Sequence, residues 1–342
     1  MLWSRRGRLR TSAVTIPLAS LSLLVLNACS GSGEGDAAAA TGPLIATTVS
    51  PITSIAAAVG GDRVRIEGIV PEGTNSHTFE PEPRTAELLS DADLILVNGL
   101  KLEDPTIALA EANMGPDGRI VEIGTAVLPE EDYIFDFSFP KEEGKPNPHL
   151  WTDPTYAVAY AGVIRDELMT LDPDNAEYYE GNFAAFRAKA EELADAVRTD
   201  QATVPEGNLK LLTYHDAYAY FAKDFGWQVI GAVQPDSFAD PAPSEVAALI
   251  EQVKAEGLPT IFGSEVFPSA VLQEIGSAAG VRYEESLRDD DLPGAPGDAE
   301  HSWLGLMRYN YATMIRGLGG DPTTLEAMDV TLDTPDTAVY PQ

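Results

Sequence analysis

The chain has 342 residues, 44% of them hydrophobic, which is enough apolar material for two compact lobes. Its formal net charge is -32, with 54 acidic and 22 basic side chains. So acidic a surface argues against nucleic acid as a partner, because phosphate backbones bind cationic surfaces. Cys29 is the only cysteine, which excludes a disulfide within the chain.

The N-terminal residues have the pattern of an export signal. The basic start "SRRGRLR" precedes the apolar stretch "TSAVTIPLASLSLLVLNACS". This stretch is short for a membrane span, which needs about 20 apolar residues. We therefore predict a secretory signal peptide over residues 1–28. Arg8 stands where a twin-arginine signal usually has a large apolar residue, so the general export route is favoured.

The stretch "LNAC" at the end of the apolar run resembles the lipobox of bacterial lipoproteins. That resemblance implies cleavage before Cys29 and a lipid on its sulfur, which would anchor the protein to the membrane. The alternative is a buried structural thiol. Residues 29–42 are small and polar and are expected to form a flexible tether between anchor and fold.

Strand and helix patterns alternate from residue 43 onward. The runs "LIATTV", "VRIEGIV" and "DLILVNG" read as strands and are separated by helical patterns. Such alternation predicts a parallel sheet covered by helices. We assign residues 43–173 to an N-terminal α/β lobe. Within it, residues 130–148 are rich in proline, acids and aromatics and are expected to form a mobile surface loop.

Residues 174–199 have the longest helical pattern. Apolar side chains recur there at helical spacing and form one stripe. They are Tyr178, Phe183, Phe186, Ala190, Leu193 and Val197. A helix of about 24 residues spans roughly 36 Å, which is long enough to join two lobes.

A second βα series follows, with "LKLLTY", "WQVIGAV", "TIFGSE" and "VRYEES" as its strands. We assign residues 200–320 to a C-terminal α/β lobe, which ends in the helical pattern "SWLGLMRYNYATMIRGLGG". The acidic tail 321–342 is expected to be loose or draped on the surface. The predicted fold class is α/β, with two parallel-sheet lobes joined by a long rigid linker helix.

Three of the four histidines lie in predicted loops beside strand or helix ends. They are His77 in "TNSHTFEP", His149 in "PNPHLWTDP" and His215 after "LKLLTY". Open α/β sheets bind ligands at the carboxyl ends of their strands. A histidine in a loop is more often simply solvated, and no HExxH motif occurs. Spacing alone therefore leaves two interpretations open: a metal site, or three solvated loop histidines.

Several longer motifs sharpen this reading. In order along the chain they are "NSHTFEPEP", "ADLILVNGLKLED", "NPHLWTDP", "YHDAYAYFAKDFGW", "GVRYEESL" and "LMRYN". Together they resemble the zinc and manganese solute-binding lipoproteins of bacterial ABC importers, over about residues 44–319. The resemblance implies a metal ion in the cleft between the lobes, with His77 and His149 from the first lobe and His215 from the second.

The resemblance places the fourth ligand at Glu285, where the family usually has aspartate in a phrase such as "DSL". Glu284 is expected to point to the other face of the strand, and Asp289–Asp291 are the alternative acids. Asp153 and Asp216 are candidates to hydrogen-bond a ligand imidazole, with helix capping as the equal alternative.

Two other residues have weaker claims. Glu265 ends a predicted strand near the cleft and is read either as an acid behind the ligands or as a salt-bridge partner. His301 matches no family ligand and is expected at the start of the last helix, with Asp298 or Ser302 as the cap. The histidine-rich loop common in zinc-type members has no counterpart in residues 130–148, which contain no histidine.

Three imidazoles and one carboxylate favour Zn²⁺ as the captured ion. Mn²⁺ is the alternative, although manganese-type members commonly have glutamate where His215 stands. The implied protein is a monomeric binding protein and not an enzyme, located at the outer face of the cytoplasmic membrane. Its partners would be an ABC permease and the cytoplasmic ATPase of that permease. A zinc hydrolase and a surface adhesin are the remaining alternatives.

Overall fold

The computed structural model describes residues 42–234, 241–264 and 270–342. The predictions for the signal peptide, Cys29, the tether up to residue 41 and Glu265 fall outside these residues. Within them, no helix is both long enough and apolar enough to cross a membrane.

The first half of the described chain forms a four-stranded parallel sheet. Its strands are β1 (Leu44–Thr47), β2 (Arg65–Gly68), β3 (Leu94–Val97) and β4 (Arg119–Glu122), in the spatial order β2-β1-β3-β4. The two central strands are fully buried, as expected for a parallel sheet covered on both faces. The helices of this half are α1 (Ser50–Gly60), α2 (Thr85–Asp91), α3 (Asp104–Asn113), α4 (Ile123–Val127) and α5 (Pro154–Leu171).

The second half repeats the arrangement. Its strands are β5 (Lys210–Thr213), β6 (Gln228–Ala232), β7 (Thr260–Ser264) and β8 (Arg282–Leu287), in the order β6-β5-β7-β8. Its helices are α7 (Ala219–Phe225), α8 (Pro243–Glu256), α9 (Ala270–Ala279) and α10 (Trp303–Gly317). Along β8 the pairing shifts from Phe262–Glu284 to Ser264–Leu287. Two residues of β8 thus oppose one of β7, which is a β-bulge.

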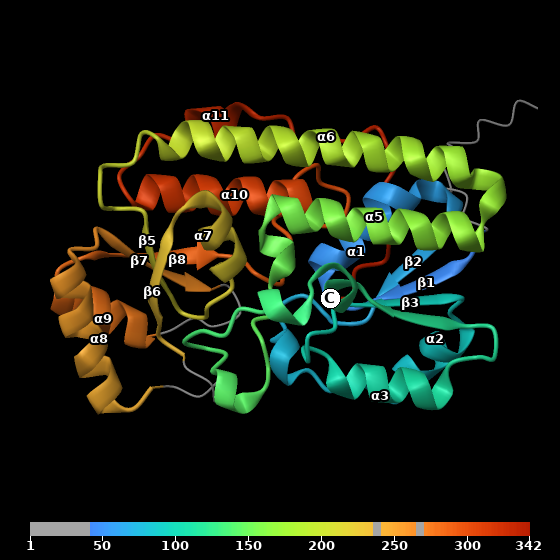
Figure 1. Ribbon diagram of the computed structural model, residues 1–342, viewed down its shortest axis with the longest axis horizontal. Coiled ribbons are helices and arrows are strands. Elements are labelled where there is room, and N and C mark those ends of the chain that lie inside the picture. Colours follow the sequence, from blue (N-terminus) through green and yellow to red (C-terminus); the bar gives the residue numbers. More distant parts are fainter. Residues whose placement is uncertain (1–41, 235–240, 265–269) are drawn as a thin grey trace, which may run out of the picture. The chain divides into compact units, whose positions relative to one another are not determined.

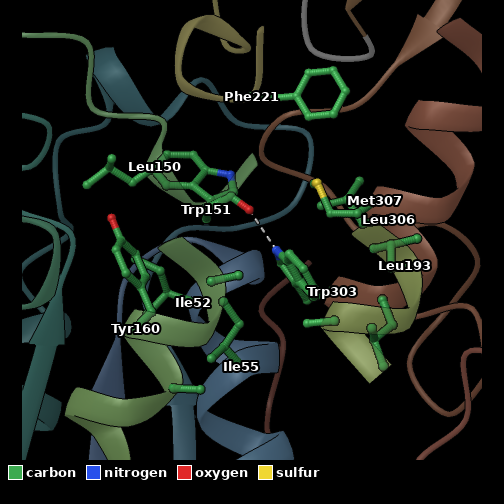
Figure 2. Packing of buried hydrophobic residues seen from close by; sticks show 14 of the residues in the cluster. Ile52, Ile55, Leu150, Trp151, Tyr160, Leu193, Phe221, Trp303, Leu306 and Met307 are labelled. Carbon is green, nitrogen blue, oxygen red and sulfur yellow. Dashed lines mark hydrogen bonds between the residues drawn. The ribbon is translucent and has the colours of Figure 1, made fainter. Parts of the chain in front are cut away.

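The long helix predicted over residues 174–199 is α6 (Ala176–Gln201), and it runs alongside elements of both halves (Figure 1). One apolar core also crosses between the halves. Trp303 at the start of α10 packs with Leu193 of α6, and its indole N–H donates to the Trp151 carbonyl oxygen at 2.8 Å (Figure 2). A shared core of this kind resists a wide hinge motion, because opening it would expose buried aromatic surface.

The C-terminal tail is draped over the fold and is not loose. A short helix, α11 (Thr323–Ala327), packs on α6, and Leu325 is fully buried. Further on, the Val339 amide donates to Ile66 O, and the Gly68 amide donates to Val339 O, both at 2.9 Å. The tail therefore adds a short bridge to the exposed edge of β2, which covers an edge that would otherwise be open.

Candidate metal centre

Each of the three predicted histidines stands at the end of a regular element. His77 lies in a 3-10 turn (Ser76–Thr78) in the loop after β2, and His149 immediately precedes the turn that leads into α5. His215 follows the end of β5. These positions belong to different halves of the chain, so only the tertiary fold can bring them together.

The fold places the three imidazoles around one point. The Nε2 atom of His149 lies 3.1 Å from Nε2 of His77 and 3.1 Å from Nε2 of His215. A tetrahedral zinc site with Zn–N bonds of about 2.0–2.1 Å requires ligand nitrogens about 3.3 Å apart. In the described part of the chain, these three residues are the one group of His, Cys, Asp or Glu close enough to hold an ion.

Asn147 sets the tautomer of His149. Its Oδ1 accepts from the His149 backbone amide at 3.0 Å and lies 2.9 Å from Nδ1 of the ring. Its amide nitrogen donates to Asp136 Oδ2 and to the Asp216 carbonyl oxygen, both at 2.7 Å, which fixes the orientation of the amide. An oxygen facing Nδ1 requires a proton on Nδ1, and Nε2 of the neutral ring then presents a lone pair toward the other two histidines.

The segment 130–148 covers the histidines, whereas the sequence predicted a mobile surface loop. The Phe139 ring lies 5.5 Å from the rings of His77 and His215 and 5.7 Å from that of His149, and it is only 6% exposed. Next to it, Ser138 Oγ donates to Gln234 O at 3.0 Å. An apolar ring in this position excludes water from one side of the site, which strengthens electrostatic interactions there.

A small pocket lies beside His77, the one half-buried member of the triad. Its volume is about 200 Å³, and His77 and Phe139 form part of its wall. Lys101, Glu143 and Lys145 also line it. Because His149 and His215 are only 0% and 3% exposed, His77 is the member of the triad nearest to solvent.

All three imidazoles are held neutral. Burial lowers the pKa of His215 from 6.5 to about 3. Burial, followed by the neighbouring imidazoles, lowers the pKa of His149 well below its ordinary value, and burial has the same main effect on His77. Neutral imidazole is the form that binds metal, so these three rings could bind an ion at neutral pH without losing a proton.

The fourth ligand is not resolved by this geometry. Glu285 belongs to β8, but its side chain lies outside what the structure describes. Glu284 still pairs regularly with Phe262, and the bulge in β8 begins only after it, at Glu285. The alternative acids Asp289–Asp291 are not part of the triad among the described side chains; they bond to other segments.

Other predicted residues have structural roles. Asp153 caps α5, accepting from the Thr155 amide at 2.6 Å, so the capping alternative describes it. Ser302 is the N-cap of α10 and accepts from the Gly305 amide at 3.0 Å. It is one of the two residues predicted as alternatives for this cap. His301 is buried beside Glu72 and is not part of the triad.

Sequence reasoning missed Asn147 and Phe139. Asn147 stands two residues before His149 in "PNPH", and a polar side chain so close to a ligand is a detectable signal. Phe139 had no such signal, because it lies ten residues from His149 and reaches the site only through the fold of its loop.

Comparisons with known proteins identify the family and agree with the fold. Residues 45–317 match the family described as "Zinc-uptake complex component A periplasmic". The manganese-binding lipoprotein MntA of Halalkalibacterium halodurans is 28% identical over 297 residues, covering 86% of this chain and 95% of the relative. The iron ABC transporter substrate-binding lipoprotein MtsA of Streptococcus pyogenes is 28% identical over 309 residues, covering 88% and 96%.

A solved structure shows the same fold. The periplasmic zinc-binding protein TroA of Treponema pallidum superimposes with a TM-score of 0.73 at 23% identity, covering 81% of this chain and 99% of that one. The relatives are named for manganese, iron and zinc, so the family is shared while the metal differs. The chain belongs to the family of periplasmic component A of zinc-uptake complexes, metal-binding proteins that serve ABC importers and are not enzymes.

Proposed function

We propose that this protein captures Zn²⁺ outside the cytoplasmic membrane and delivers it to an ABC permease driven by a cytoplasmic ATPase. The ligands are His77, His149 and His215, with Glu285 as the fourth. The observation that carries this proposal is the convergence of three Nε2 atoms, with Nε2–Nε2 distances of 3.1 Å from His149 to each of the other two.

The donor set supports zinc over manganese. Zn²⁺ accepts imidazole nitrogen in tetrahedral geometry, whereas Mn²⁺ favours oxygen donors and higher coordination. The manganese-binding relative is the specific observation in favour of Mn²⁺ as the second candidate. Glu285 would add oxygen character to either site.

The proposal includes a lipid anchor at Cys29 and a monomeric protein. The relatives MntA and MtsA are named lipoproteins, and "LNAC" provides the cysteine after an apolar run. Cys29→Ser should move the protein from the membrane fraction to a soluble or unprocessed form. If the variant is still cleaved before residue 29 and stays with the membranes, the anchor is elsewhere.

The test of the metal is a competition experiment. Metal-free protein, prepared by treatment with a chelator, is mixed with equimolar Zn²⁺, Mn²⁺ and Fe²⁺. The bound metal is measured after desalting. We expect zinc to dominate in the parent. His215→Glu, which exchanges a nitrogen donor for a charged oxygen donor, should reduce the preference for zinc over manganese. Preferential retention of manganese by the parent would reject the zinc assignment.

A further inference from the structure

Three consecutive acids, Asp289–Asp291, follow strand β8 and are almost fully buried. Their exposures are 4%, 4% and 8%. Buried carboxylates are costly unless they are hydrogen-bonded, so their partners indicate what they do. Asp289 Oδ1 accepts from Ser264 Oγ of β7, whereas Asp290 and Asp291 accept from the loop that carries His77.

Two of these acids bond the backbone of the loop that carries His77. The Gly73 amide donates to both carboxylate oxygens of Asp291, at 2.8 and 2.9 Å. The Ser76 amide donates to Asp290 Oδ2 at 3.2 Å. Gly73 has a φ of 78°, in the left-handed region that suits glycine. Hydrogen bonds to a charged acceptor are stronger than neutral ones, so these contacts hold the loop firmly.

The same stretch of chain also contacts the segment of His149, and the loop of His77 contacts the C-terminal tail. Trp151 stands two residues after His149, and its indole N–H donates to the Asp289 carbonyl oxygen at 2.9 Å. At the start of the His77 loop, Glu72 Oε1 accepts from the Leu292 amide at 3.3 Å, and the Glu72 amide donates to Pro341 O at 3.0 Å. Residues 72–76 are thus bonded to the second half of the chain and to the tail.

An ion can leave the triad only when a ligand moves. His77 is the half-buried ligand beside the pocket, whereas His149 is braced by Asn147 and His215 directly follows a buried strand. Movement of the His77 loop is therefore the route that disturbs the least buried structure. That movement requires the bonds from Gly73 and Ser76 to break.

We propose that Asp290 and Asp291 are positioning residues that clasp the His77 loop to the second half of the chain, so that opening of this clasp controls the release of the metal ion. The proposal rests on the proposed metal-binding function and adds a regulatory element to that site. Opening the clasp frees the ligand nearest to solvent while His149 and His215 keep their places.

The test uses the full chain and three alanine variants, Asp290→Ala, Asp291→Ala and Asp200→Ala. Asp200 is the matched control, because it is also buried and accepts from two backbone amides, those of Thr324 and Leu325, but away from the site. The rate of Zn²⁺ dissociation is measured by transfer to an excess chelator. We expect Asp290→Ala and Asp291→Ala to dissociate faster by about 10- to 100-fold, the usual effect of losing a partner behind a ligand. Asp200→Ala should keep the parent rate.

Two further measurements separate positioning from ligation and from general destabilisation. Asp291→Asn keeps one oxygen acceptor for Gly73 and should restore much of the parent rate. The absorption spectrum of bound Co²⁺ should be unchanged in Asp291→Ala, because the ligand set is intact. A changed spectrum would make this acid a ligand and overturn the proposal.

Hydrogen exchange of the apo protein tests the clasp without any metal. The Gly73 and Ser76 amides should lose protection in the Asp291→Ala and Asp290→Ala variants respectively, and not in Asp200→Ala. Retained protection means that there is no clasp, and lost protection with an unchanged dissociation rate means that the clasp does not control release. If the parent itself binds no zinc, the proposed function fails while the exchange data still decide whether the clasp exists.

Discussion

Two buried histidines, His149 and His301, have very different surroundings. They are 0% and 4% exposed. The ring of His149 is held by Asn147 and faces two other imidazoles at 3.1 Å. The ring of His301 packs edge-on against Tyr340 and lies 3.7 Å from Glu72 Oε1. Neither ring nitrogen of His301 has a hydrogen-bond partner among the described residues.

The difference shows that burial of an imidazole does not by itself make a metal ligand. A ligand needs a lone pair directed at a point where other donors also converge, and in most metal sites a partner on its second nitrogen fixes the ring. His149 meets both conditions. His301 fills space between the tail and the His77 loop, which is a structural role.

The largest expected effect comes from removing each histidine in turn. His149→Ala should weaken Zn²⁺ binding by more than the roughly 10- to 100-fold that loss of an outer partner costs. His301→Ala should leave zinc affinity unchanged and lower the free energy of unfolding by about 1–3 kcal/mol, as for a typical buried substitution. Calorimetric titration and chemical denaturation measure the two quantities. A loss of zinc affinity in His301→Ala would break the comparison.

The second prediction concerns Glu285, the proposed fourth ligand. Glu285→Ala should weaken zinc binding strongly, because it removes one donor and the only ligand charge, whereas Glu284→Ala should matter much less. Each variant changes one residue of β8: Glu284 lies just before the bulge and Glu285 begins it. If calorimetric titration shows equal losses of zinc affinity in the two variants, the fourth ligand is assigned to the wrong residue of β8.

The third prediction concerns the partner of the His149 ring. Asn147→Ala should lower zinc affinity by about 10- to 100-fold, because Nδ1 loses the acceptor that selects the binding tautomer. Asn182→Ala is the matched control, since it removes an asparagine that donates to a backbone carbonyl, Val59 O at 2.9 Å, on α6. The control should bind zinc like the parent. Similar losses in both variants would indicate general destabilisation instead of tautomer control.

The smallest expected effect is a change in how steeply the free energy of unfolding depends on pH. The folded-state pKa of His215 is about 3, against about 6.5 for an unperturbed imidazole. Between these values the unfolded chain binds a proton that the folded chain does not, so the stability of the apo protein should rise with pH and fall on acidification. Replacing His215 by Phe should flatten the dependence of the unfolding free energy on pH between 4 and 6.5. An unchanged slope would contradict the lowered pKa.

The limits of the sequence are clearest at particular residues. The alternation of strand and helix, the long helix and the three histidines were all predicted, because periodicity and motif order are properties of the chain itself. The tail is draped over the fold, one of its two predicted states, whereas the segment 130–148 packs on the histidines through Phe139 instead of forming a mobile surface loop. Polar composition predicts a loop but not whether that loop packs against a site. The bulge at β8 was equally hidden, because it depends on the pairing with β7.

By itself, the sequence determined the family, the βα order and the three histidines that the fold brings together, since each was recognised from residues close together in the chain. Only the tertiary structure decided that Asn147 orients His149, that Phe139 covers the site and that Asp290 and Asp291 hold the loop of His77. The first contact joins residues only two positions apart, but the others join residues from 10 to more than 200 positions apart. Local sequence patterns carry no information about such distances, because they arise only when the two halves pack around a shared core.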